Sequence, residues 1–206
     1  MSEQETNETQ GDDAPAPVRK RPRPGERRLQ ILQTLASMLE QPGAERITTA
    51  ALSARIGVSE AALYRHFASK AQMFEGLIDF VEQSIMGLIR QVTDREAEGP
   101  VQASRIVALL VQFGEKNPGM TRVMTGDALV HEHARLQERV NLLFDKIEAQ
   151  LRQSLRSSEG ATPTVDAQVT ASLLVAFLMG RLQRYARSGF KRLPSEQLAL
   201  CLARLV

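Results

Sequence analysis

The chain of 206 residues has little cysteine and few aromatic residues. Its single cysteine, Cys201, excludes a disulfide bond within the chain. Tryptophan is absent and aromatic residues make up only 4% of the sequence, so leucine, alanine, isoleucine, valine and methionine supply most of the apolar mass. Because β-rich chains depend on aromatic and β-branched residues, this balance favours helices.

The sequence also lacks a long hydrophobic run. No stretch of about 18 consecutive apolar residues occurs, so we expect no membrane span and no membrane partner. The first 17 residues are polar and acidic, without the apolar segment that a secretion signal contains. These two absences lead us to expect a cytoplasmic protein.

Charge is distributed unevenly near the N-terminus, although the net charge of the chain is only +2. Residues 1–17 contain five acids and no base, whereas residues 18–28 are strongly basic. The acidic composition and four prolines predict a disordered tail over residues 1–25. Its basic part is a candidate arm for the minor groove of DNA, although a purely solubilising tail would have the same composition. The arm residues expected to contact DNA are Arg19, Lys20, Arg21 and Arg23.

Helical spacing of apolar residues continues through the rest of the chain and predicts an all-α fold of about nine helices. We expect two helical domains, one over residues 26–71 and one over residues 72–206. Pro42-Gly43 and Asn117-Pro118-Gly119 are the strongest turn signals. The longer helices are expected over residues 26–40, 70–95, 101–116, 129–155 and 166–188, with short ones over residues 120–125 and 195–205.

The most informative stretch consists of two short helices that flank Gly57-Val58-Ser59. The first begins at Thr48 or Thr49 and stops at Gly57, which can adopt a positive φ. Val58 should fill the angle between the helices, and Ser59 should cap the second helix. Small residues of the first helix, Ala51 and Ala54, would allow the two helices to approach closely. This pattern predicts a helix-turn-helix whose second helix enters the major groove.

The outer face of that second helix should carry the residues that contact DNA. Tyr64 and His66 can donate hydrogen bonds to phosphates, and Lys70 can add positive charge. Arg65 suits a guanine edge, but it could equally hold a phosphate. The residues expected at this interface are Thr48, Thr49, Ser59, Glu60, Ala61, Tyr64, Arg65, His66 and Lys70.

Residues 26–74 resemble the N-terminal domain of the TetR family of regulators. The resemblance is carried by Thr49, by Tyr64-Arg65-His66-Phe67 and by Ser69-Lys70. It implies an all-α fold and a homodimer formed by the last two long helices. It also implies a DNA-binding protein without enzymatic activity, catalytic residues or a cofactor.

A finer resemblance to certain members of this family covers residues 46–49, 57–67, 113–119 and 147–153. Those members bind dispersed chromosomal sites and, when bound to DNA, antagonise assembly of the tubulin-like division GTPase FtsZ. The resemblance therefore implies FtsZ as a partner, and association with the nucleoid.

The same resemblance places the FtsZ groove between the fourth and fifth helices, at Phe80, Leu109, Lys116 and Asn117. The sequence departs from it by carrying Leu88 and Gln112, where the resemblance leads us to expect Arg and Gly. From its apolar stripe alone, Phe80 would be a core residue. Lys116 and Asn117 would be ordinary residues at a helix C-terminus.

The helix expected over residues 166–188 is apolar nearly all round, so it needs a partner on every side. We expect one face to meet a second copy of the chain, with Ala171, Ala176 and Gly180 allowing close approach. Two-fold symmetry then predicts a pseudo-palindromic DNA site. The sequence leaves open whether two dimers share one such site.

Other function classes find less support in the residues. His131 and His133 are two apart on an expected helix and would not share a face, so we expect no metal site. No serine, histidine and aspartate group as a nucleophile with its base. The alternative that remains is a ligand-responsive repressor, which would need an apolar cavity in the C-terminal domain.

Overall fold

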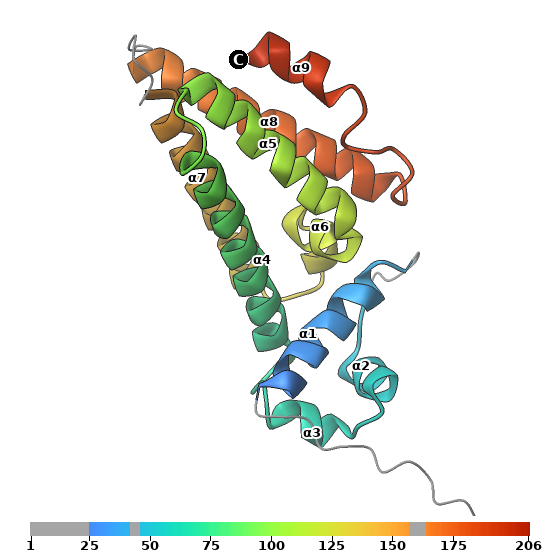
Figure 1. Cartoon of the computed structure of the whole chain (residues 1–206). Coiled ribbons are helices and arrows are strands. Elements are labelled where there is room, and N and C mark those ends of the chain that lie inside the picture. The colour runs from blue at the N-terminus through green and yellow to red at the C-terminus, as the bar shows by residue number, and fades with distance from the viewer. Residues whose placement is uncertain (1–24, 42–45, 157–163) are drawn as a thin grey trace, which may run out of the picture.

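In the computed structural model, residues 25–41, 46–156 and 164–206 are described, and the secondary structure of this part of the chain is entirely helical (Figure 1). Residues 1–24 of the predicted tail, including Arg19, Lys20, Arg21 and Arg23, lie outside the described residues. None of the helices in the described ranges is long and apolar enough to cross a membrane. The helices are α1 (Glu26–Leu39), α2 (Thr49–Ile56), α3 (Glu60–Tyr64), α4 (Lys70–Thr93), α5 (Gly99–Lys116), α6 (Pro118–Met124), the 3₁₀-helix η1 (Asp127–Leu129), α7 (Ala134–Arg156), α8 (Thr164–Arg187) and α9 (Leu198–Leu205).

Side-chain caps explain where the helices around the predicted turn begin. The hydroxyls of Thr48, Ser59 and Ser69 accept hydrogen bonds from the backbone N–H groups of the first turns of α2, α3 and α4. Helix α2 ends at Gly57, whose φ of 76° lies in the left-handed region that favours glycine. The predicted helix-turn-helix is therefore confirmed, with Thr48 rather than Thr49 as the cap of its first helix.

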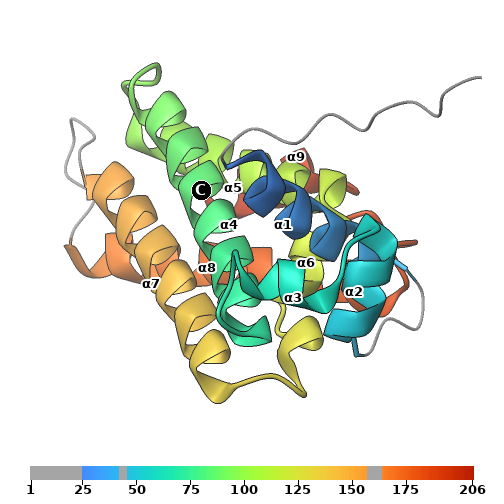
Figure 2. The same ribbon diagram turned by 90° about the horizontal axis from the view of Figure 1, so that it is seen from below.

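The long helices α4, α5, α7 and α8 form the body of the molecule around one apolar core. Helices α1 to α3 lie at one end of this body, and α9 lies beside α5 and α8 near the other end (Figure 1). Seen from that first end, α2 and α3 face the viewer, with α4 and α7 side by side behind them (Figure 2). The short helices of the predicted DNA-binding unit are thus presented at an extremity of the molecule.

Several details of the expected packing are wrong. Leu29 is exposed, although the helical spacing of apolar residues that predicts α1 includes it. Ala51 and Ala54 are also exposed, because α2 turns a different face toward α3. The apolar residues that these two helices bury in the core are Leu52 and Leu63 instead.

Helix α7 begins later than the sequence pattern suggests. The apolar spacing that starts at Leu129 belongs first to η1, and the chain is then non-helical until Ala134. His131 and His133 consequently lie ahead of α7 rather than on a helix. Helix α9 also begins later, at Leu198, because residues 188–197 form a loop.

Gly119 lies where the DNA-binding helices contact the body of the molecule. The sequence marks it as a turn residue, but it lies inside α6, and only Asn117 separates α5 from α6. A Cβ atom on Gly119 would collide with the backbone carbonyl oxygen of Ala36 in α1. Arg122 of α6 adds a hydrogen bond from its guanidinium to the carbonyl oxygen of Leu39, at 3.2 Å. The backbones of α1 and α6 are therefore in direct contact.

Four ion pairs connect α4 with α7 and the segment just before it. Residue numbers rise together along the pairs, so the two helices run parallel. In three of the pairs α4 supplies the acid and α7 the base; the fourth, at the end near α3, has the opposite polarity. The pairs of this ion-pair ladder are Lys70–Glu132, Glu75–Arg135, Asp79–Arg139 and Glu82–Lys146.

Candidate nucleic-acid interface and partner groove

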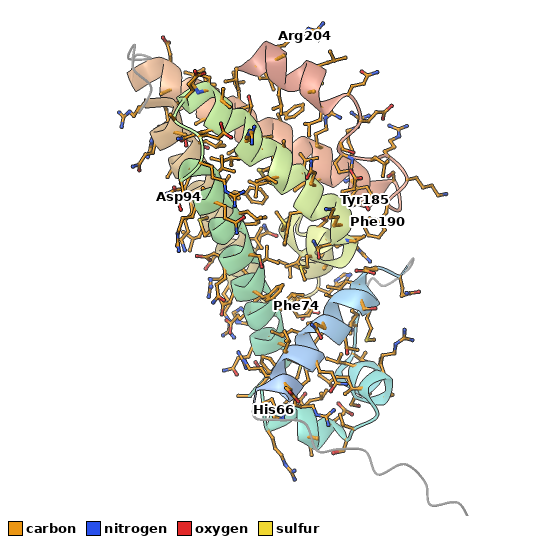
Figure 3. The ribbon with its side chains drawn as sticks, in the orientation of Figure 1. His66, Phe74, Asp94, Tyr185, Phe190 and Arg204 are labelled. Carbon is orange, nitrogen blue, oxygen red and sulfur yellow. The ribbon has the colours of Figure 1, made fainter. Side chains whose placement is uncertain are left out.

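The outer face of α3 is exposed, as the sequence predicts. Tyr64 is 45% exposed, while Leu63 and Phe67 point into the core. His66, just beyond the helix, marks the same end of the molecule in Figure 3. The exposed residues of this face are Ser59, Glu60, Ala61, Tyr64, Arg65 and His66. Among the described residues, the structure therefore brings most of the expected DNA contacts onto one accessible surface, the reading surface.

Arg28 holds the end of α3 in place, a role that the sequence analysis missed by counting it with the basic segment. Its guanidinium lies 4.0 Å from the centre of the Phe67 ring. It also donates a hydrogen bond to the carbonyl oxygen of His66 at 3.0 Å. A sequence signal did exist, because Arg28 precedes the buried Ile31 and Leu32 by three and four residues and so shares their helical face.

A second contact joins the starts of α2 and α3. The hydroxyl of Thr49 donates a hydrogen bond to a carboxylate oxygen of Glu60 at 2.5 Å. The other carboxylate oxygen of Glu60 can accept from the amino group of a cytosine, whereas its charge would repel a phosphate. Thr48 uses its hydroxyl to cap α2. Besides being expected DNA contacts, these two threonines therefore position Glu60 and the start of α2.

Lys70 differs from the other expected DNA contacts. Its ammonium group forms the ion pair with Glu132, and it lies 5.7 Å from the centre of the Phe74 ring. The side chain is only partly exposed, and that of Glu132 is nearly buried. A contact between Lys70 and a phosphate stays a prediction, and it would require this ion pair to open.

The expected partner groove follows the α4–α5 hairpin, which is closed near its loop by an ion pair of 2.8 Å between Glu96 and Arg105. A pocket of ≈ 350 Å³ lies between the two helices close to this loop. Leu109 lines it together with Leu88 and Gln112, the two positions that depart from the resemblance. One of the expected groove residues therefore does border a cavity.

The other expected groove residues lie outside this pocket. Phe80 is 38% exposed, so its interpretation as a core residue is wrong. Lys116 is exposed at the C-terminus of α5, and the amide of Asn117 donates to the carbonyl oxygen of Phe113 at 2.7 Å. Helices α4 and α5 diverge from their connecting loop (Figure 1). Phe80 lies on α4, whereas Lys116 is the last residue of α5.

Helix α8 leaves an apolar stripe uncovered. Val169 and Leu173 are each 53% exposed, and Met179 and Gly180 continue the exposed face along the helix. Ala171 was expected on this face but is buried within the chain. The stripe is the surface through which we expected a second copy to bind.

Both halves of the chain match models of known protein families. Residues 31–77 match the model of bacterial regulatory proteins of the tetR family. Residues 98–203 match a tetracyclin repressor-like C-terminal domain of the SlmA-like type.

Similar solved structures include the fatty acid degradation regulator FadR of Bacillus halodurans, with a TM-score of 0.71 and 12% identity over 88% of this chain and 95% of that one. The TetR-family regulator PfmR of Thermus thermophilus has a TM-score of 0.68 and 18% identity, over 85% and 96% of the two chains. At these identities the likeness concerns the fold. The chain belongs to the TetR family of regulators, and its architecture is that of their DNA-binding fold.

Sequence relatives narrow the assignment. The nucleoid occlusion factor SlmA of Photobacterium profundum is 52% identical over 174 residues, which cover 82% of this chain and 89% of the relative. The SlmA of Idiomarina loihiensis is 51% identical over 173 residues, with coverage of 82% and 88%. Within the TetR family, the chain is therefore closely similar to the SlmA nucleoid occlusion factors.

Proposed function

We propose that a homodimer of this chain, bound to pseudo-palindromic chromosomal sites, prevents assembly of the FtsZ ring over the nucleoid. The observation that carries the proposal is the 52% identity to a nucleoid occlusion factor over 82% of the chain. This similarity extends through both the helix-turn-helix and the C-terminal helices. It therefore supports a shared output as well as shared DNA binding.

In this proposal, residues 26–71 read the DNA, while residues 72–206 dimerise and bind the partner. Tyr64 and Arg65 are exposed at the end of α3 and can reach a groove. The basic segment ahead of α1 would add affinity that falls steeply with salt, because its cations displace counterions from the DNA.

FtsZ would bind along the α4–α5 hairpin. Phe80 offers an exposed aromatic ring on α4, Leu109 lines the pocket near the loop, and Lys116 supplies a cation at the far end of α5. Aromatic side chains, phenylalanine included, are enriched at protein interfaces relative to the rest of the surface. Helix α4 begins only a few residues after α3, which connects the reading surface directly with this groove.

The alternative of a ligand-responsive repressor receives less support from the interior of the C-terminal helices. A cavity among Met124, Phe144, Met179 and Leu182 has a volume of ≈ 50 Å³. Pockets that enclose small-molecule ligands usually have volumes of about 300–1,000 Å³. This cavity is therefore too small to enclose the ligand of such a sensor.

The proposal can be tested by sedimentation of FtsZ polymers with and without DNA that carries a specific site. We expect the DNA-bound protein to reduce the polymer in the pellet, and Phe80→Ala to abolish most of this effect while DNA binding is retained. Val130→Ala is a suitable control, because Val130 is also exposed but lies before α7, outside the hairpin. Wild-type protein without any DNA-dependent effect on FtsZ would disprove the proposed function.

A further inference from the structure

A second basic site lies at the C-terminal end of α8, separate from the reading surface. Between residues 181 and 197 the sequence contains five bases and a single acid. Three of these bases line a pocket of ≈ 250 Å³ at the end of α8 and the loop that follows it. The pocket residues are Arg181, Arg184, Arg192, Leu193, Pro194, Glu196 and Gln197.

Arg181 is fixed in this pocket without being neutralised. Its guanidinium donates to the carbonyl oxygens of Glu196 and Pro194, at 2.6 and 3.4 Å, and to the sulfur of Cys201 at 3.0 Å. It also lies 4.8 Å from the centre of the Phe177 ring. All these partners are uncharged, so the positive charge of Arg181 remains available to an anion.

Arg184 and Arg192 add two further charges. Both side chains are exposed, and within the described ranges neither has a carboxylate close enough for an ion pair. Glu196 is the one acid that lines the pocket, and its carboxylate forms no ion pair with any described residue. The pocket therefore carries an excess of positive charge.

The loop that bears Arg192 is held in a defined shape. The hydroxyl of Ser188 accepts hydrogen bonds from the backbone N–H groups of Lys191 and Arg192, at 3.1 and 2.9 Å. The rings of Tyr185 and Phe190 pack with their centres 5.1 Å apart, and Figure 3 shows both at this end of α8, away from His66. Desolvation, with Glu115 and Glu40, raises the pKa of Tyr185 above 10.0, so its hydroxyl adds no negative charge near neutral pH.

We propose that this pocket binds a small soluble anion that carries one or two phosphate groups. Guanidinium groups match phosphate oxygens in pairs of hydrogen bonds, and several arginines around a small volume suit a compact group of high charge. The proposal does not depend on the role in division, because it rests on residues outside the reading surface and the α4–α5 hairpin.

Calorimetric titration of the full-length protein with inorganic pyrophosphate, at constant ionic strength, tests the site. We expect Arg184→Gln/Arg192→Gln to weaken binding by about tenfold or more, since each arginine supplies charge-assisted hydrogen bonds. Arg90→Gln/Arg204→Gln is the charge-matched control, because both residues are exposed outside the pocket, and it should retain wild-type affinity. Glu196→Gln should tighten binding, because it removes the only acid that lines the pocket in the described part of the chain.

Three results would overturn the proposal. One is an equal loss in the pocket variant and the charge-matched control, which would indicate unspecific attraction. Another is loss of binding in Arg65→Gln alone, which would place the pyrophosphate on the DNA interface. The third is a difference between wild type and pocket variant that appears with phosphatidylglycerol vesicles but not with pyrophosphate, which would indicate a lipid headgroup. Light scattering should first verify that the variants retain the molar mass of the wild-type protein.

Discussion

Gly119 illustrates how a single residue can be essential for a reason that its sequence context hides. Beside Asn117-Pro118 it indicates a turn, yet it lies in α6, and its missing side chain lets α6 touch the backbone of α1. The obstacle that a side chain would meet there is a carbonyl oxygen of the backbone, which cannot move aside by changing a rotamer.

We expect Gly119→Ala to destabilise the protein by about 1–3 kcal/mol, the usual range for an overpacked site, and to loosen the DNA-binding helices from the body. Gly87→Ala is the matched control, because a Cβ atom at Gly87 in α4 would meet no atom within 4 Å. Its higher helix propensity should stabilise the protein by about 0.5–1 kcal/mol. Urea denaturation measures both changes, and equal stability of the two variants would contradict the packing argument.

At this scale, the sequence predicts residues whose role is local. Ser59 as a cap and Gly57 as a left-handed stop depend only on neighbouring backbone groups, and both are confirmed. Arg28, Lys70 and Phe80 depend on which distant segment packs beside them. Periodicity along one helix does not reveal such neighbours.

The ladder between α4 and α7 belongs to the scale of whole elements. Each of its pairs is at least partly exposed, so each alone contributes at most about 1 kcal/mol. Their matched spacing along the two helices matters more, because a shift of α4 along α7 would separate several of the pairs at once.

We expect the charge reversals Asp79→Arg and Arg139→Asp to destabilise the protein individually, because each places like charges opposite one another. The double reversal should recover most of the loss, and high salt should reduce all three differences. Denaturant titrations at low and high ionic strength provide the measurement. Simple addition of the two single effects in the double variant would exclude a direct interaction.

The elements themselves were largely predictable because most helices of the chain are amphipathic and bounded by caps or turns. Errors occurred where apolar spacing continued through a different structure, as at Leu129 in η1. The parallel pairing of α4 with α7 was not predictable, since the charges on each helix are also compatible with solvent exposure.

The apolar stripe on α8 concerns the whole molecule, because we expect it to determine the oligomeric state. Leu173 stands near its middle and is 53% exposed in the single chain. Burial of such leucines against a second copy would stabilise the dimer by removing their surface from water.

We expect Leu173→Glu to yield monomers in sedimentation velocity experiments, because it would bury unpaired charges at the interface. Affinity for a two-fold symmetric DNA site should fall by about tenfold or more, since the two reading surfaces would no longer be linked. Val130→Glu places the same charge at a residue that is 73% exposed, away from the stripe, and should remain dimeric. A dimeric Leu173→Glu variant would assign the interface to another surface.

The unbroken course of α4 has a consequence for how a chromosome would display this protein. With 24 residues, α4 is about 36 Å long and contains no interruption between its first turn, beside α3, and the hairpin that leads to α5. Together with the contact at Gly119, it connects the two ends of the described part of the chain rigidly. The direction of the DNA axis would then determine the orientation of both α4–α5 hairpins in a dimer. Under the proposed function, an array of bound copies would present FtsZ with binding sites in a fixed orientation.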